Sequence, residues 1–308
     1  MNTASQAPVM PRSHPALRAL RFALPSLLVL GLVALLTVQS RINDRARFTG
    51  CPPATPEALA CLGGLQPSSL TLELAGSGHQ LACQLRSVAG SAASSMPTPS
   101  ERFCIEAQVQ TRWDELETLD ARLFMPIYGL YSLLVAAWIA LQSRAGSGAL
   151  ERRPLVAAMG IVVTTILLLV LDARENAHAL ALLVDAERGP LSAPHHAAMD
   201  AAASAARSAS LHKWAASAVW AAMLAWGLAQ WKEARRPLQR WPRLVAILAA
   251  AAAASLFAVA VVVAACQPEA LEGPVHHLQN GLVLAFLSMA AVAVAAAATR
   301  DPAQAHTD

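Results

Sequence analysis

Three polar residues, Asp172, Glu175 and Asn176, interrupt an otherwise apolar helical stretch that begins near residue 154. On an α-helix, positions i, i+3 and i+4 lie on one face, so these side chains form a polar stripe, whereas Arg174 and His178 lie on another face. An ionisable group near the bilayer centre costs about 2.5–3.5 kcal/mol and is usually paired or functional. The stripe therefore requires a partner.

The apolar pattern on both sides of the stripe predicts one long helix over residues 154–187, about 50 Å in length. Gly189-Pro190 should break this helix, and a second helix should return antiparallel to it. Lys213 on the returning helix would then lie within about two turns of the height of Asp172. We expect Lys213 to form an ion pair with Asp172 or Glu175.

Carboxylates beside a lysine permit two kinds of role. The first is a structural ion pair that fixes two helices against each other, with Asn176 forming hydrogen bonds across the bundle. The second is a working site that binds a cation, moves a proton or recognises a zwitterionic headgroup. The residue types allow both roles.

The composition places these residues in a membrane protein. The 308-residue chain is 56% hydrophobic and 14% charged, with a net charge of +3, which is too apolar for an ordinary soluble domain. The basic residues gather in short clusters between apolar stretches and do not alternate with aromatic residues. This distribution indicates how the spans are oriented in the membrane. It argues against nucleic-acid binding.

The apolar stretches predict about six transmembrane helices with both ends of the chain in the cytoplasm, because the basic clusters fall between alternate spans. Residues 22–38 form an anchor, although a cleaved signal peptide fits the same pattern. Residues 1–21 and 300–308 are cytoplasmic tails, and residues 120–299 form the membrane bundle. Its spans lie near residues 123–141, 155–175, 213–231, 244–265 and 281–298.

Residues 39–119 are richer in Pro, Ser, Gly and Thr, and we interpret them as a small extracytoplasmic insert. It contains four cysteines, Cys51, Cys61, Cys83 and Cys104, which predict two structural disulfides. Spacing leaves three pairings open; Cys51–Cys61 and Cys83–Cys104 are the pairs of sequence neighbours that we favour. Alternating patterns at residues 70–74 and 103–109 predict two short strands.

The remaining candidates for chemistry carry weaker signals. Six histidines fall near the predicted outer level, at positions 178, 195, 196, 212, 276 and 277. Their spacing favours solvated histidines over a metal or haem site, so we expect neither a metal nor a cofactor. Cys266 is an odd fifth cysteine, for which we expect a buried free thiol, with an intermolecular disulfide as the alternative. The chain has no Gly-x-Ser-x-Gly, no His-Glu-x-x-His and no glycine-rich phosphate or dinucleotide loop.

The order of three motifs resembles a group of poorly characterised bacterial multi-pass membrane proteins. The motifs are Asp120 with Phe124 and Tyr128 at a span start, then Asp172-x-x-Glu175-Asn176, then Lys213-Trp214. The resemblance covers residues 120–231. It implies a shared polar cluster that includes Asp120, and it implies no substrate.

We therefore expect an all-α protein of the bacterial inner membrane with a disulfide-stapled outer insert, in contact with membrane lipids. The leading hypothesis is a binding or transport-related protein with an outward-facing cluster of Asp120, Asp172, Glu175, Asn176 and Lys213. A small molecule, an ion or a protein could be its partner. The alternatives are an enzyme acting on lipid or a lipid-linked substrate, with Asp172 or Glu175 as general base, and a structural or assembly subunit.

Overall fold

The computed structural model of the chain describes residues 15–45, 60–65, 68–86, 99–142, 152–188, 193–231, 237–267 and 270–298. These residues form helices and turns, with no strand among them. Residues 1–14 of the predicted tail 1–21, the predicted tail at residues 300–308, Cys51 and the break at Gly189-Pro190 lie outside this description, whereas residues 15–21 belong to a helix. The predicted all-α class is thus confirmed for the described part of the chain.

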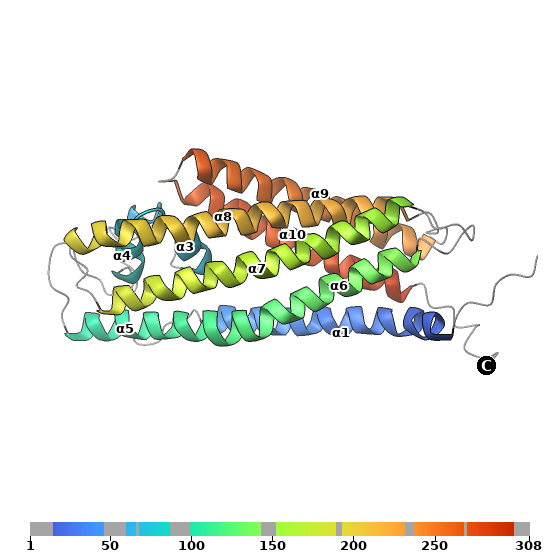
Figure 1. Ribbon diagram of the computed structural model, residues 1–308, viewed down its shortest axis with the longest axis horizontal. Coiled ribbons are helices and arrows are strands. Elements are labelled where there is room, and N and C mark those ends of the chain that lie inside the picture. Colours follow the sequence, from blue (N-terminus) through green and yellow to red (C-terminus); the bar gives the residue numbers. More distant parts are fainter. Residues whose placement is uncertain are drawn as a thin grey trace, which may run out of the picture.

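Long helical rods dominate the described structure (Figure 1). One rod is continuous over α5 (Pro99–Asp114), the π-helix η1 (Glu115–Phe124) and α6 (Met125–Gln142). The other long helices are α1 (Pro15–Arg45), α7 (Arg152–Arg188), α8 (Ala193–Ala229), α9 (Pro237–Cys266) and α10 (Glu272–Ala297). Two short helices, α3 (Ser69–Leu74) and α4 (Gly78–Arg86), lie between α1 and α5 in the sequence.

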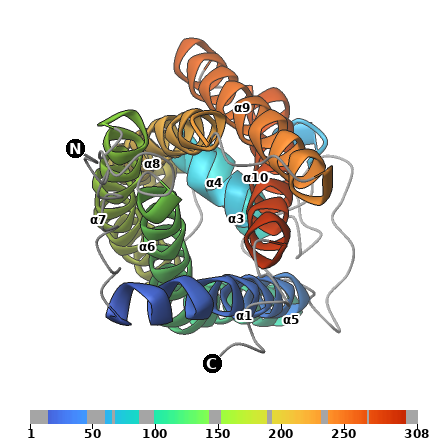
Figure 2. The ribbon, with the colours of Figure 1, turned by 90° about the vertical axis from the view of Figure 1, so that its right-hand side faces the viewer.

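The long helices form a closed ring in sequence order. Each of α6, α7, α8, α9 and α10 packs against the next, and α1 closes the ring by contacting both α6 and α10. The end-on view shows this arrangement (Figure 2). Helices α3 and α4 lie against α8 toward the end of the bundle where α7 ends and α8 begins (Figure 1). Consecutive helices are antiparallel, so residues far apart in the sequence meet at similar heights.

The interior of the ring is filled by large side chains. Tyr131 is fully buried, and its hydroxyl donates a hydrogen bond to the Met289 carbonyl at 2.7 Å, which joins α6 to α10. The rings of Trp138 and Trp231 meet edge to face at 4.9 Å. Tyr131, Trp138 and Trp231 therefore serve as core packing groups.

The outer surface of the bundle is apolar. Leucine, isoleucine and valine side chains are exposed along α1, α7 and α9, for example Leu30, Val163 and Val262. Five described segments are long and apolar enough to cross a membrane: Ala23–Ile42, Val109–Leu141, Arg152–Val184, Arg240–Cys266 and Glu272–Ala297. The predicted span in α8 is not among them, because alanine and tryptophan largely replace leucine and valine there. Exposed apolar surface of this kind is typical of a membrane protein.

The predicted long hairpin is present. Helices α7 and α8 each contain 37 residues and pack side by side in antiparallel orientation. At 1.5 Å per residue, each is about 55 Å long and exceeds the roughly 30 Å hydrocarbon core of a bilayer. Both helices of the hairpin are therefore longer than the apolar layer of a bilayer is thick.

Both predicted strands are wrong, because their residues are helical. At residues 70–74, Ser68 caps a helix: its hydroxyl accepts the Thr71 N–H at 3.2 Å, and the Thr71 hydroxyl accepts the Ser68 N–H at 2.7 Å. This capping box supplies hydrogen-bond partners for the backbone N–H groups of the first turn. The alternating apolar and polar residues at 70–74 do not reveal it. Residues 103–109 belong to α5 and continue without a break into the second predicted span.

The favoured disulfide pairing is also wrong. Cys61 pairs with Cys83, with their Cα atoms 6.1 Å apart. Gly63 and Gly64, at φ +66° and +81°, turn the chain after Cys61, and glycine adopts this left-handed backbone without a Cβ penalty. Cys104 is disulfide-bonded as well, whereas Cys266 is free and exposed instead of buried.

Close packing of α9 on α10 depends on Gly281. A Cβ at this position would lie 2.6 Å from the Phe257 ring, whereas a Cβ on Gly273, also in α10, would meet only Val263 at 3.9 Å. We predict that Gly281→Ala lowers the free energy of unfolding by about 1–3 kcal/mol through overpacking, and that Gly273→Ala does not lower it. Thermal unfolding of the detergent-solubilised protein measures both, and equal stability of the two variants would contradict the packing.

Candidate functional site

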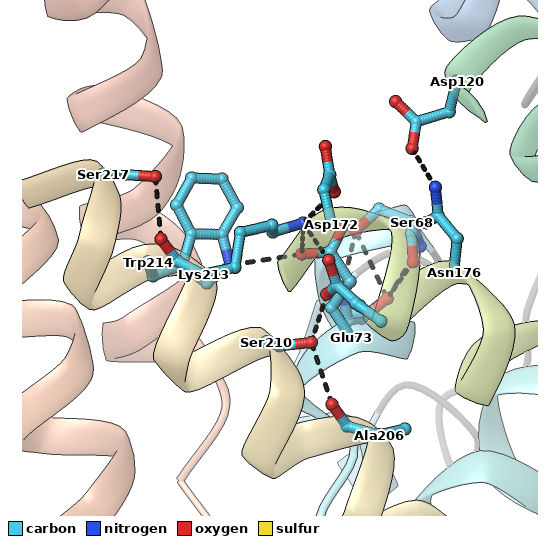
Figure 3. A network of polar contacts seen from close by, with 12 residues as sticks. Ser68, Glu73, Asp120, Asp172, Asn176, Ala206, Ser210, Lys213, Trp214 and Ser217 are labelled. Carbon is cyan, nitrogen blue, oxygen red and sulfur yellow. Dashed lines mark hydrogen bonds and ion pairs between the residues drawn. The ribbon is translucent and has the colours of Figure 1, made fainter. Parts of the chain in front are cut away.

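Three carboxylates converge on the Lys213 ammonium (Figure 3). Its Nζ lies 3.2 Å from Glu73 Oε2 and 3.3 Å from Asp172 Oδ1, and it forms a third ion pair with Glu175. The four side chains come from three elements, α3, α7 and α8. The predicted pairing of Lys213 with the stripe on α7 is confirmed, and a third carboxylate joins it. We call Glu73, Asp172, Glu175 and Lys213 the carboxylate–lysine cluster.

Neighbouring donors hold each carboxylate in place. The Tyr128 hydroxyl donates to Asp172 Oδ2 at 3.0 Å, and the Trp214 indole N–H donates to Glu73 Oε2 at 3.2 Å. The Ser210 hydroxyl donates to Glu175 Oε1. Hydrogen bonds to an ionised group stabilise it more than those between neutral groups.

Asp120 and Asn176 form a separate hydrogen-bonded pair beside this cluster (Figure 3). The Asn176 amide donates to Asp120 Oδ2 at 2.7 Å, which links η1 to α7. Within η1 the helix is wound more widely, so the Met125 N–H bonds to the Asp120 carbonyl five residues back. π-Helical turns of this kind often occur at functional sites. Of the five predicted residues, the structure thus joins Asp172, Glu175 and Lys213 by ion pairs and places Asp120 and Asn176 in a separate hydrogen-bonded pair.

The cluster is withdrawn from solvent. Asp172 is 5% exposed and Glu175 2% exposed, and the side chains of Lys213 and Glu73 are 12% and 14% exposed. Arg174, on the other face of α7 as predicted, is exposed. In such surroundings charges interact more strongly than in water, and an uncompensated charge is costly.

Glu73 owes its position to contacts that fix the single turn of α3. The buried Arg207 guanidinium donates to the Leu74 carbonyl at 3.1 Å and to the Ala264 carbonyl at 2.7 Å, which links the ends of α3 and α9 through α8. At the start of α3, the Gln84 amide donates to the Ser68 carbonyl at 3.2 Å. The two bonds from Arg207 satisfy carbonyls in the last turns of α3 and α9, which have no partner within their own helices.

Aromatic packing supports the cluster from the α9 side. The Lys213 ammonium lies 4.8 Å from the centre of the Trp214 ring, a cation–π distance. The Trp214 ring in turn packs on Phe257 with centroids 5.4 Å apart. Phe257 is the residue that fits against Gly281, so the packing of α9 on α10 extends to the cluster.

Sequence reasoning missed Glu73, Ser210 and the contact of Tyr128 with Asp172. Glu73 lies in the segment interpreted as a strand of an outer insert, far from residue 172 in the sequence. The available signal was an isolated carboxylate flanked by Leu72 and Leu74 directly after a Ser68-x-x-Thr71 pattern. Ser210 stands one turn before Lys213 and so shares its face of α8.

The pKa of the Glu73 carboxyl is raised above its usual range by burial, and Lys213 opposes the shift. The folded protein therefore binds a proton on Glu73 more tightly than the unfolded chain does. As the pH rises from the usual glutamate pKa, about 4.3, toward the raised value, the folded state loses stability relative to the unfolded state.

We predict that Glu73→Gln flattens this decline in stability between about pH 4 and the raised pKa, by up to about 1.4 kcal/mol per pH unit for one proton. Glu106→Gln on α5 is the matched control, because Glu106 is exposed. Apparent Tm measured against pH reports the effect. An unchanged slope in Glu73→Gln would show that Glu73 does not take up the proton.

Removal of the ammonium should destabilise the fold strongly. Lys213→Met leaves buried carboxylates without a counter-charge, and we predict a loss of about 3–5 kcal/mol in the free energy of unfolding. Adding Glu175→Gln should restore part of this loss, since it removes one of those charges. Arg174→Met, at an exposed position on α7, should change stability by less than about 0.5 kcal/mol. Similar losses in Lys213→Met and Arg174→Met would disprove the charge pairing.

No protein-family model, curated protein or solved structure matches this chain. The resemblance to bacterial multi-pass membrane proteins therefore stays a prediction.

Proposed function

We propose that the chain is a six-span protein of the bacterial inner membrane with both termini in the cytoplasm. The segment of residues 60–86, which contains α3 and α4 and is called the α3–α4 region, lies outside. The basic clusters support this orientation, because they flank helix ends that gather at one end of the bundle: the start of α1, the end of α6, the start of α7, the end of α8 and the start of α9. Positive charge beside spans is retained in the cytoplasm. The disulfide between Cys61 and Cys83 favours an oxidising compartment for the opposite end.

The place of α8 in the ring supports counting it as the sixth span. It packs between α7 and α9, and its residues Trp220, Ala221 and Leu224 are buried in the core. A helix that is covered by neighbours requires less apolar side-chain surface than one exposed to lipid. Its last carbonyls, those of Leu228 and Ala229, accept hydrogen bonds of 2.9 Å from Arg243.

We further propose that the carboxylate–lysine cluster binds and transfers protons in a transport-related protein. One observation carries this proposal: three buried carboxylates surround a single ammonium. If all were ionised, two negative charges of the cluster would have no counter-charge within it. The Asp120 carboxyl group, which accepts a hydrogen bond from Asn176, is a further acidic group beside the cluster. Because burying uncompensated charge is costly, at least one carboxyl group should hold a proton.

A proton fits this cluster better than a metal cation does. The Lys213 ammonium already occupies the position between the carboxylates that a metal ion would take, at 3.2–3.3 Å from Glu73 and Asp172. A proton requires no cavity and no additional oxygen ligands. Carboxyl groups within a membrane bundle commonly serve as proton relays.

The hydrogen bonds supply a path for such a transfer. Tyr128 contacts Asp172, Asp172 and Glu175 share Lys213, and Ser210 contacts Glu175. Hydroxyl groups can both donate and accept, so Tyr128 and Ser210 can pass a proton to or from the carboxylates they touch. Glu73 extends the path toward the α3–α4 region.

The same contacts favour one second candidate, a fixed structural ion pair. They tie α3, α7 and α8 together, and a protein with this purpose would hold its charges without exchanging protons. The ligand-binding and lipid-enzyme alternatives would additionally require an organic partner at the cluster. A measured proton flux distinguishes proton transfer from the structural ion pair, the ligand-binding protein and the lipid enzyme.

The test is a proton-flux assay on the purified protein in liposomes that enclose a pH-sensitive dye, with a potassium diffusion potential as the driving force. We predict that the wild-type protein changes the internal pH faster than empty liposomes do. Glu175→Gln should reduce the rate to that of empty liposomes, because its amide cannot bind and release the proton.

Glu106→Gln, which removes an exposed carboxylate, is the matched control and should behave as the wild type. Correct folding of each variant is checked by its thermal unfolding before reconstitution. A wild-type rate equal to that of empty liposomes would overturn the transport proposal. An unchanged rate in Glu175→Gln would remove the cluster from the path.

A further inference from the structure

Three metal-ligating side chains meet at the Cys61–Cys83 disulfide, apart from the carboxylate–lysine cluster. The imidazole Nε2 of His79 lies 3.5 Å from Cys61 Sγ and 3.7 Å from Cys83 Sγ. His79 and Cys83 stand four residues apart on α4, so both side chains lie on one helix face. Cys61 joins them from the turn at residues 60–65. These three ligand atoms lie within 4.8 Å of one another.

The two sulfur–nitrogen distances match those of a tetrahedral zinc site. With Zn–S near 2.3 Å and Zn–N near 2.05 Å, the edges of a tetrahedron require S···N separations of about 3.5 Å and an S···S separation of about 3.75 Å. His79 Nε2 already satisfies the requirement toward both sulfurs at once. Only the sulfur atoms must separate, which happens when the disulfide is reduced.

The position of the group allows a reductant and a metal ion to reach it. His79 is exposed, Cys61 is half-buried, and Cys83 is 9% exposed. The three residues belong to the α3–α4 region, outside the five apolar segments that could span a membrane. Cys61 is therefore the sulfur that is open to attack.

We propose that reduction of the Cys61–Cys83 disulfide converts it, together with His79, into a zinc-binding site. A dithiol protein or small-molecule dithiol supplies the reduction: its thiolate attacks Cys61 Sγ, the S–S bond breaks, and its second thiol resolves the mixed disulfide. Two electrons and two protons pass to the cysteines, and the reductant becomes a disulfide. Zn²⁺ then displaces the two thiol protons and is bound by two thiolates and the His79 imidazole.

The ligand set determines the class of metal. Two thiolates and one imidazole suit Zn²⁺, whereas hard cations such as Mg²⁺ and Ca²⁺ prefer oxygen ligands. Three protein ligands leave the fourth tetrahedral position for water or an external ligand. The zinc site is independent of proton transfer, because it includes none of the residues of the carboxylate–lysine cluster.

The test is a titration of the full-length protein in detergent with Co²⁺, a spectroscopic substitute for Zn²⁺, before and after reduction with a phosphine under anaerobic conditions. We expect no binding in the oxidised protein. The reduced protein should bind one Co²⁺ per chain, with the thiolate charge-transfer and tetrahedral ligand-field absorption of a Cys₂His site. Zn²⁺ should then displace the Co²⁺.

The variants locate the site. Cys61→Ser/Cys83→Ser retains Cys51, Cys104 and Cys266 and should lose the thiolate signal, whereas His79→Ala should weaken Zn²⁺ binding at least about 10-fold. His212→Ala, at an exposed position on α8, is the matched control and should bind as the wild type. Circular dichroism of the reduced proteins monitors their helix content.

Three results would overturn the proposal. The first is equal Co²⁺ binding by the oxidised and reduced proteins. The second is retention of the thiolate signal in the double cysteine variant. The third is reduced wild-type protein that binds no Co²⁺, whether or not its helices persist.

Discussion

The site depends on the ion pairs that the Lys213 ammonium forms with the carboxylates around it. It brings together carboxylates from α3 and α7, with 3.2 Å to Glu73 and 3.3 Å to Asp172. A buried pair of this kind contributes little net stability when complete, but it becomes costly when one partner is lost. The cluster has more carboxylates than ammonium groups, and on the proposed function this imbalance is relieved by a bound proton.

The same cluster couples the α3–α4 region to the bundle. Glu73 reaches Lys213 because Arg207 holds the end of α3 and Trp214 donates to the Glu73 carboxylate. Arg207 also bonds to the end of α9, and Trp214 packs on Phe257. A displacement of α3 would therefore change the number of carboxylates at Lys213. Helix α3 is therefore part of the site, because it supplies Glu73.

The long elements were predictable because their physical signals are strong. Apolar runs and basic flanks indicated the helices, and the i, i+3, i+4 spacing placed Asp172, Glu175 and Asn176 on one face opposite Lys213. The strand at residues 70–74 was predicted wrongly because a five-residue alternation is weaker than the Ser68 capping box. The disulfide pairing was predicted wrongly because sequence neighbours need not meet after a glycine turn, and Cys61 meets Cys83. Glu73 could not be assigned, since its partner lies 140 residues away and only tertiary packing joins them.

The proposed proton transfer requires that a carboxyl group of the cluster hold a proton in the folded protein. Infrared spectroscopy at neutral pH tests this most directly, because a protonated carboxyl group has a carbonyl stretch that an ionised carboxylate lacks. We predict this band in the wild-type protein and its loss or shift in one of three single variants, Glu73→Gln, Asp172→Asn or Glu175→Gln. A spectrum without the band, or a band that none of the three variants alters, would contradict the account.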